Sequence, residues 1–437
     1  MRVRSDIVAG LSRAGTTRTG RRCLAACAAV LAVAAGAALS APATAVNGDS
    51  RPDQRWTAAW GASPVAGAAI PWMPNCQAGA GLTEQTVRNV LFLSAGGTQV
   101  RIRLSNTFGT TALAVGRASV AVQAGTDATP VGGTLRQLTF NNGGTGVTIV
   151  AGGQVLSDPV DLTVAPLSTL LVSVYVAGPT GPVTNHPFTA QGNFIAAGDR
   201  TMSGSTTDFS ADNPCWMFVD GVDVRSRGPV LGSVVALGDS ITDTSATSGN
   251  ANHRWPDYLA ARLVARRGPT LSVVNAGLGG NRVLAPRDGE PYWGVPALAR
   301  LDRDVFAQTG VRSVILFEGV NDIGYDASAA ELIAGYQQII AQTHAQGLRI
   351  FGGTVTQFKG SFIWTEQRAA TWRALNTWIR TSGAFDGVFD FAAALADPAD
   401  PDALKPAFDS GDHLHPNDAG CAAIAGAVNL DRLLATA

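Results

Sequence analysis

The hydrophobic pattern of the chain changes near Gly232, and this change limits the possible folds most. After it, short apolar runs alternate with longer segments of helical spacing. The apolar runs predict strands at 233–237, 271–275, 311–317, 348–353 and 387–391. The segments between and after them predict helices at 256–267, 295–308, 328–346, 365–382 and 417–434. Because strands that alternate with helices form parallel sheets covered on both faces, we expect an α/β domain over residues 231–437.

Residues 46–230 lack any long helical period and predict a β-rich domain. Two apolar runs at 86–94 and 98–106 are separated by Ala95-Gly96-Gly97, which predicts a hairpin. Residues 98–106 alternate between apolar and polar side chains, so one face of this strand should be buried and the other wet. Gly, Pro, Asn and Asp punctuate further candidate strands at 112–123, 147–151, 167–177 and 216–224. This pattern favours a β-sandwich or jelly-roll-like domain.

The first 45 residues are typical of a targeting segment. Six Arg lie within residues 1–22, and an uninterrupted apolar run of 17 residues follows at 23–39. Ala43-Thr44-Ala45 then fits the small-x-small cleavage pattern of a signal peptide. The alternative is a membrane anchor, but the run is short and Ala-rich for a span of roughly 20 residues. We therefore expect a cleaved signal peptide at 1–45 and a secreted, extracellular protein, exported by either the general or the twin-arginine route.

The net charge limits the possible binding partners, and the positions of the cysteines indicate which of them could form a disulfide. Removing residues 1–45 takes six Arg and one Asp from the 32 basic and 33 acidic residues, which leaves a net charge of −6. With no basic patch, we expect no nucleic-acid partner. Cys76 and Cys215 lie among turn residues and could form a disulfide after export. Cys421 lies on an apolar helical stretch, which predicts a buried free thiol.

Four short polar motifs follow predicted strands or occupy the last long loop. They are Gly238-Asp239-Ser240, residues 275–280, Gly319-Val320-Asn321-Asp322, and residues 412–416. Ligands bind at this edge of open α/β sheets, beyond the carboxyl ends of the strands. Alone, each motif could be an ordinary turn or helix cap. Together they supply a nucleophile, oxyanion donors and an Asp/His pair, the parts needed for acyl transfer to water.

Two of the five His residues of the chain fall in the last motif. Asp412 and His415 are three residues apart, a spacing that lets the carboxylate curl back onto the imidazole Nδ1. His413 is adjacent to Asp412 and should point away from it. The chain has no Gly-x-Ser-x-Gly nucleophile elbow, and Arg282 stands where a dinucleotide fingerprint needs its third Gly. No His, Cys and carboxylate cluster has metal-ligand spacing, so we expect neither a metal nor a cofactor.

In this order, the four motifs resemble the four blocks of the SGNH (GDSL) hydrolase superfamily, over roughly residues 234–416. The resemblance implies a flavodoxin-like three-layer αβα domain. The N-terminal half is similar to β-rich domains that precede the hydrolase in some secreted bacterial members of this superfamily.

The resemblance also implies a role for each motif. Ser240 would be the nucleophile, His415 the general base and Asp412 the residue that orients His415. The oxyanion hole would consist of the Ser240 N–H, the Gly280 N–H and the Asn321 side-chain amide.

These observations predict a secreted carboxylic-ester hydrolase that acts on a small-molecule or polymer-borne ester through an acyl-enzyme. The loops at 245–250 and 284–293 are polar and rich in Gly and Pro, without a long apolar lid, which favours short acyl groups. We expect no stable membrane anchor, and carbohydrate contact through the β-rich domain. The alternative is a polysaccharide-binding protein whose hydrolase domain is inactive.

Overall fold

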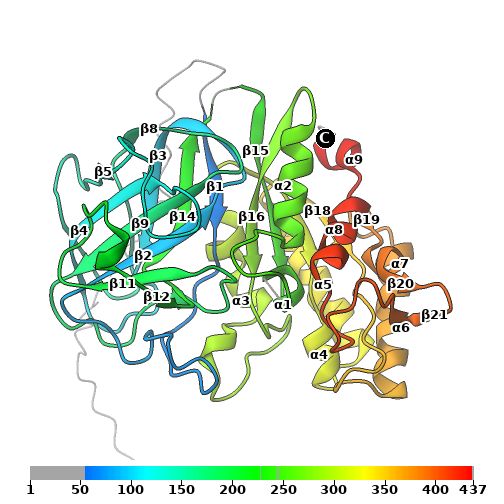
Figure 1. Ribbon diagram of the computed structural model, residues 1–437. Helices are drawn as coiled ribbons and strands as arrows, with labels where there is room; N and C mark the ends of the chain where they lie inside the picture. Colours follow the sequence, from blue (N-terminus) through cyan, green and yellow to red (C-terminus); the bar gives the residue numbers. More distant parts are fainter. Residues whose placement is uncertain (1–54, 227, 244–245, 436–437) are drawn as a thin grey trace, which may run out of the picture. The chain divides into compact units, whose positions relative to one another are not determined.

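The computed structural model describes residues 55–226, 228–243 and 246–435. The predicted signal peptide at 1–45 therefore lies outside the described residues. Residues 55–226 form antiparallel sheets, here called the sandwich, and residues 228–435 form a parallel sheet with helices (Figure 1). The division of the chain into domains at residue 230 stays a prediction, because the described residues form one compact unit.

Five parallel strands run through the C-terminal part. In spatial order they are β16 (Thr270–Gly277), β15 (Val230–Gly238), β17 (Val311–Phe317), β18 (Arg349–Gly353) and β19 (Gly387–Phe389). Counted along the chain this is the order 2-1-3-4-5, which is that of the flavodoxin-like doubly wound fold. Most of the strand residues are buried, because helices cover both faces. The predicted fold class is confirmed.

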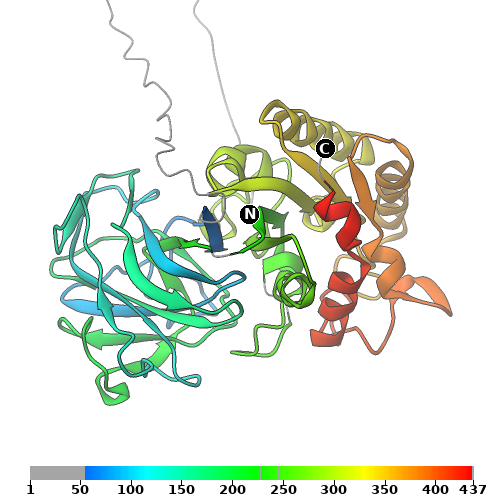
Figure 2. The same ribbon diagram turned by 90° about the horizontal axis from the view of Figure 1, so that it is seen from above.

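Helices lie on both sides of the sheet. Seen from above, α2 (Trp255–Ala265) and α8 (Asp418–Ala427) pack together on one side, and α3 (Ala297–Leu301) and α5 (Ala329–Ala345) lie on the other (Figure 2). The predicted capping box begins α5, since the Ser328 hydroxyl accepts the Glu331 N–H at 3.2 Å. The remaining helices are α1 (Ser240–Asp243), α4 (Val320–Gly324), α6 (Glu366–Thr381), α7 (Phe391–Leu395) and α9 (Leu430–Leu434). Within the described residues, no helix is both long and apolar enough to cross a membrane.

Two predicted helices are not continuous α-helices. The segment predicted at 295–308 begins with α3 and continues as a π-helical turn at Asp302–Phe306. In the segment predicted at 417–434, the first helix, α8, ends at Ala427, because Val428 adopts an extended conformation. The Asn429 side chain then accepts the Arg432 N–H at 2.9 Å and caps the separate helix α9.

The sandwich consists of two large antiparallel sheets around a common hydrophobic core. The first sheet contains β1 (Trp56–Gly61), β14 (Val219–Arg225), β3 (Gly97–Ser105), β7 (Gln154–Leu156) and β8 (Val160–Val164). The second contains β12 (Ser210–Asn213), β11 (Asn193–Ala197), β2 (Gln85–Phe92), β9 (Thr169–Val176), β4 (Leu113–Val122), β5 (Arg136–Gln137) and β6 (Val147–Ile149). A small two-stranded sheet in the sandwich pairs β10 (Asn185–His186) with β13 (Trp216–Met217). Another, in the C-terminal part, pairs β20 (Ala396–Asp397) with β21 (Asp400–Leu404).

The predicted hairpin between residues 86–94 and 98–106 is wrong. β2 pairs with β9 and β11, whereas β3 pairs with β14, β7 and β8, so the two strands lie in different sheets. Neither Gly96 nor Gly97 has the positive φ of a tight hairpin turn. Both are needed for close packing, because a Cβ at Gly96 would lie 2.7 Å from the Val164 carbonyl oxygen and one at Gly97 would lie 2.6 Å from that of Arg225.

The second face of β3 is half-buried, so it is less exposed than the expected wet face. Val100, Ile102 and Leu104 are fully buried on the core face, as predicted. On the other face, Arg103 reaches the C-terminal part and donates to the Gln308 Oε1 at 3.1 Å. The sandwich therefore packs directly against the parallel-sheet part.

Strand β1 joins the two parts. Ala58 packs in the core of the parallel-sheet part, whereas its neighbours Ala59 and Trp60 pack in the core of the sandwich. The Ser272 hydroxyl of β16 donates to the Ala58 carbonyl at 2.6 Å. One strand thus contributes to both cores.

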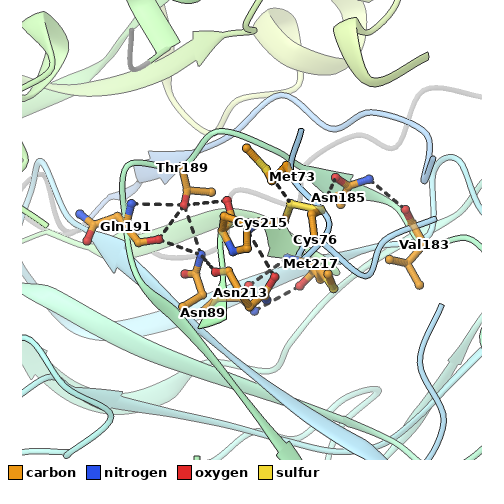
Figure 3. Close-up of a disulfide and its surroundings, with 12 residues drawn as sticks. Met73, Cys76, Asn89, Val183, Asn185, Thr189, Gln191, Asn213, Cys215 and Met217 are labelled. Carbon is orange, nitrogen blue, oxygen red and sulfur yellow. Dashed lines mark hydrogen bonds between the residues drawn. A yellow bond between two sulfur atoms is a disulfide. The ribbon is translucent and has the colours of Figure 1, made fainter. Parts of the chain in front are cut away.

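The predicted disulfide between Cys76 and Cys215 is present, with Cα atoms 5.6 Å apart (Figure 3). It links the 70–80 loop to the segment just before β13, beside Asn185 of β10 (Figure 3). Cys421 is a buried free thiol, as predicted, and burial raises its pKa to about 12.

Candidate active site

The carboxyl ends of β16, β15 and β17 meet at one edge of the sheet. Gly238, at the end of β15, lies opposite Gly277 of β16 on one side and Phe317 of β17 on the other. Ser240 begins α1, two positions after the last residue of β15. The loop that contains Gly280 follows β16, and Asn321 follows β17. The fold therefore brings three of the four motifs to the place where strand order reverses, the usual ligand site of such sheets.

The fourth motif brings His415 onto Ser240. The Ser240 Oγ lies 3.0 Å from the His415 Nε2, and the His415 Nδ1 lies 2.5 Å from the Asp412 Oδ2. The Asp412 Oδ1 accepts the backbone N–H of His415 at 2.8 Å, so the carboxylate curls back over three residues. A carboxylate on Nδ1 leaves Nε2 as the ring atom that faces the hydroxyl.

Asp412 is held in its charged form. Burial by itself would raise its pKa, but hydrogen bonds from the His415 side chain and backbone and from the Leu414 N–H outweigh burial and lower the pKa well below its usual range. The carboxylate therefore stays ionised and can orient and stabilise the imidazole.

Gly280 adopts a left-handed conformation with φ of +67°. A Cβ at this position would lie 2.5 Å from the Trp293 ring, so only glycine fits here without strain. Within the described residues, its N–H donates no hydrogen bond. The loop is joined to the serine motif by a hydrogen bond of 3.0 Å from the Leu278 N–H to the Gly238 carbonyl.

The orientation of the Asn321 amide is set by two neighbours. Its Oδ1 accepts a hydrogen bond from the Arg287 Nη2 at 3.1 Å, and its Nδ2 donates to the Asn281 carbonyl at 2.9 Å. Because a guanidinium only donates, Oδ1 must face Arg287 and the amide N–H groups must point the other way. One of the two Nδ2 protons is used by Asn281, which leaves a second for a ligand.

His413 is directed away from Ser240. Its Nδ1 lies 2.6 Å from the Asp409 Oδ2, and its side chain is largely exposed. The two histidines of this motif thus have separate carboxylate partners, Asp409 and Asp412.

Sequence reasoning missed a buried charged cluster beneath the strand ends. The Arg300 guanidinium is fully buried and donates to the carbonyls of Gly238 and Ala276, at 3.0 and 2.7 Å, which ties the ends of β15 and β16 together. Burial raises the pKa of Asp239 to about 7 and that of Glu318 to about 8, although Arg300 opposes both shifts. Arg300 lies in the helix α3, and its position in the sequence carries no motif.

No three or more His, Cys, Asp or Glu side chains within the described residues are placed to hold a metal ion. The Ser240, His415 and Asp412 side chains are hydrogen-bonded in series here, and the loops that contain Gly280 and Asn321 follow the neighbouring strands β16 and β17.

One protein family matches the part of the chain that contains these residues. Residues 236–423 match the GDSL-like Lipase/Acylhydrolase family profile. No curated protein matches the sequence. Solved structures similar to this chain include a lipase/acylhydrolase from Enterococcus faecalis, with 18% identity, 45% of this chain and 92% of that chain covered, and a TM-score of 0.35.

A carbohydrate acetylesterase from Sinorhizobium meliloti and an aryl esterase from M. smegmatis are also similar to this chain. Each has 14% identity, 45% of this chain and 95% of its own chain covered, and a TM-score of 0.36. The matched residues include Ser240, Gly280, Asn321, Asp412 and His415. Residues 236–423 are thus a GDSL-like lipase/acylhydrolase domain.

Proposed function

We propose that this protein is a secreted serine carboxylic-ester hydrolase that works through an acyl-enzyme on Ser240. One observation carries the proposal: the continuous relay from the Ser240 hydroxyl through the His415 ring to the Asp412 carboxylate, with distances of 3.0 and 2.5 Å. A hydroxyl whose proton can pass to an oriented imidazole is an activated nucleophile.

In the proposed mechanism, His415 Nε2 takes the Ser240 proton as Oγ attacks the ester carbonyl. The tetrahedral oxyanion is held by the N–H groups of Ser240 and Gly280 and by the Asn321 amide. The intermediate then collapses, and the alcohol leaves with the proton from His415. Water, activated by the same imidazole, attacks the acyl-enzyme and releases the acid.

Two measurements test the reaction. Wild-type protein should hydrolyse 4-nitrophenyl acetate and should be labelled by a fluorophosphonate probe, and folded Ser240→Ala should do neither. Substantial turnover in the folded variant would show that Ser240 is not the nucleophile. An unlabelled wild type would favour the alternative, a polysaccharide-binding protein with an inactive hydrolase domain, which the intact relay does not favour.

Secretion is supported by the disulfide between Cys76 and Cys215, because such bonds persist in oxidising compartments. We also propose a preference for short acyl groups, on the basis of the polar loop at 284–293. Rates on 4-nitrophenyl esters from acetyl to palmitoyl would test this preference. A maximum at long chains would show that the protein is a lipase instead.

A further inference from the structure

We propose that His186, from the sandwich, is a positioning residue for the oxyanion hole and that it acts through Asp243. This inference rests on the proposed function and gives the sandwich a part in catalysis. It starts from another histidine–aspartate pair, which is buried and which the mechanism above does not use.

The pair contacts the Gly280 loop directly. The His186 Nε2 lies 2.9 Å from the Asp243 Oδ1, and the Asp243 Oδ2 accepts the Gly279 N–H at 2.8 Å. Gly279 immediately precedes Gly280, whose N–H is the proposed oxyanion donor. Asp243 is also the last residue of α1, the short helix that Ser240 begins. One carboxylate therefore joins the nucleophile turn to the oxyanion loop.

His186 is fixed at both ring nitrogens. Its Nδ1 lies 2.8 Å from the backbone carbonyl oxygen of Ser63, which can only accept, so Nδ1 carries a proton. The side chains of His186 and Asp243 are each only 3% exposed. Because water has little access to these hydrogen bonds, breaking one would leave a buried polar group without a partner.

The sandwich supports this loop at further points. A Cβ at Gly279 would lie 3.2 Å from the Phe188 ring, so the loop backbone packs closely against the segment that follows β10. The Ser63 hydroxyl lies 3.0 Å from the Arg300 Nη1, and Arg300 holds the Gly238 carbonyl at the end of β15. Ser63 and His186, both in the sandwich, thus support the end of β15 and the Gly280 loop.

Loss of this support should affect turnover more than substrate binding. The Gly280 N–H interacts most strongly with the oxyanion, which forms only in the transition state. A shift of about 1 Å in a catalytic group can cost on the order of 100-fold in rate. Without His186, the loop keeps its sequence but loses its fixed position, so kcat should fall while KM changes little.

The experiment compares His186→Ala, Asp243→Ala and Asp243→Asn in the full chain. In Asp243→Asn, the amide oxygen can still accept the Gly279 N–H, and the amide N–H can donate to Nε2 of a neutral His186. This variant keeps both hydrogen bonds and should rescue the loss seen in Asp243→Ala. The matched control is Asn106→Ala, which removes a buried amide that donates to the Thr111, Ile149 and Val150 carbonyls within the sandwich.

Two readouts are used: kcat and KM for 4-nitrophenyl acetate, and the inhibition constant of an alkyl trifluoromethyl ketone, whose serine adduct carries an oxyanion. We expect His186→Ala and Asp243→Ala to lower kcat by roughly 10- to 100-fold and to weaken inhibition by a similar factor, with KM nearly unchanged. Asp243→Asn should recover most of the loss, and Asn106→Ala should retain the kcat of the wild type.

Several results would overturn the inference. These are wild-type kcat in folded His186→Ala, an equal loss of kcat in Asn106→Ala, or no recovery in Asp243→Asn. If His186→Ala does not fold, as judged by circular dichroism, the two Asp243 variants decide the question. If the wild type neither hydrolyses the ester nor reacts with a fluorophosphonate, the proposed function itself fails, which is a distinguishable result.

Discussion

The His415–Asp412 pair and the His186–Asp243 pair are built in different ways. His415 and Asp412 are three residues apart on one turn, and their side chains are 24% and 44% exposed. His186 and Asp243 are 57 residues apart, lie on different parts of the fold, and are only 3% exposed each. We call His415 and Asp412 the outer pair, because they are close in sequence and partly exposed to water. We call His186 and Asp243 the inner pair, because they are far apart in sequence and buried.

The difference matches the work each pair can do. Under the proposed mechanism, the outer pair must exchange protons with a substrate and with water, which requires access. The inner pair holds backbone in place, which is favoured by burial, because a buried hydrogen bond has few competitors. We therefore expect the outer pair to transfer protons and the inner pair to hold the oxyanion loop in position, and the following measurements test this difference.

The largest effect is expected at the outer pair. His415→Ala should reduce kcat on 4-nitrophenyl acetate by at least roughly 1,000-fold, comparable to the loss of Ser240, because nucleophile and base act as a unit. His413→Ala is the matched control, since His413 faces Asp409 and should be far less important. Both are measured at neutral pH on folded protein. The reverse ranking would mean that the general base has been assigned to the wrong histidine.

A smaller effect, on stability, is expected from the disulfide near the inner pair. Cys215 immediately precedes Trp216, which pairs with His186 between β13 and β10. Replacing Cys76 and Cys215 with Ser should lower the free energy of unfolding by about 2–5 kcal/mol, measured by urea denaturation. Because His186 keeps its own partners, kcat well below the unfolding transition should stay close to that of the wild type.

The control for this variant is Cys421→Ala, which removes a buried thiol but no cross-link and should destabilise less. Equal unfolding midpoints with and without the disulfide would contradict the prediction. A large fall in kcat without the disulfide would show instead that it is needed to hold His186.

A further effect on stability, visible only as a slope with pH, is expected at Glu318, in the buried cluster around Arg300. Glu318 lies 3.6 Å from Arg300, and its burial raises its pKa from 4.5 to about 8. The folded protein therefore keeps a proton that the unfolded chain releases, so the associated stability is present below pH 4.5 and is lost as the pH rises towards about 8. Glu318→Gln should remove this loss.

Across that window, the unfolding free energy of the wild type should fall relative to Glu318→Gln by up to about 1.4 kcal/mol per pH unit. Urea denaturation at several pH values provides the measurement. Glu84→Gln, at an exposed carboxylate, is the control and should run parallel to the wild type. Parallel curves for Glu318→Gln and the wild type would mean that Glu318 is already ionised in the folded protein.

Local signals predicted the parallel-sheet part well. The strand at Val311–Phe317 and the capping box before α5 both have the predicted position, because periodicity and caps depend on residues a few positions apart. The Gly-Gly signal after β2 was misleading, because glycine serves tight turns and close packing equally. Only the contacts of Gly96 and Gly97 with distant backbone distinguish the two uses.

The sequence by itself determined the order of strands and helices in the C-terminal part, the motifs at the strand ends, and the Asp412–His415 spacing that curls one turn onto itself. The tertiary structure decided which sheet β2 and β3 join, where Arg300 is buried, and that His186 meets Asp243. The physical reason is range. A carboxylate three residues from an imidazole can find it by local backbone geometry alone. Residues 57 positions apart meet only when two separate cores pack together, and no local spacing records that packing.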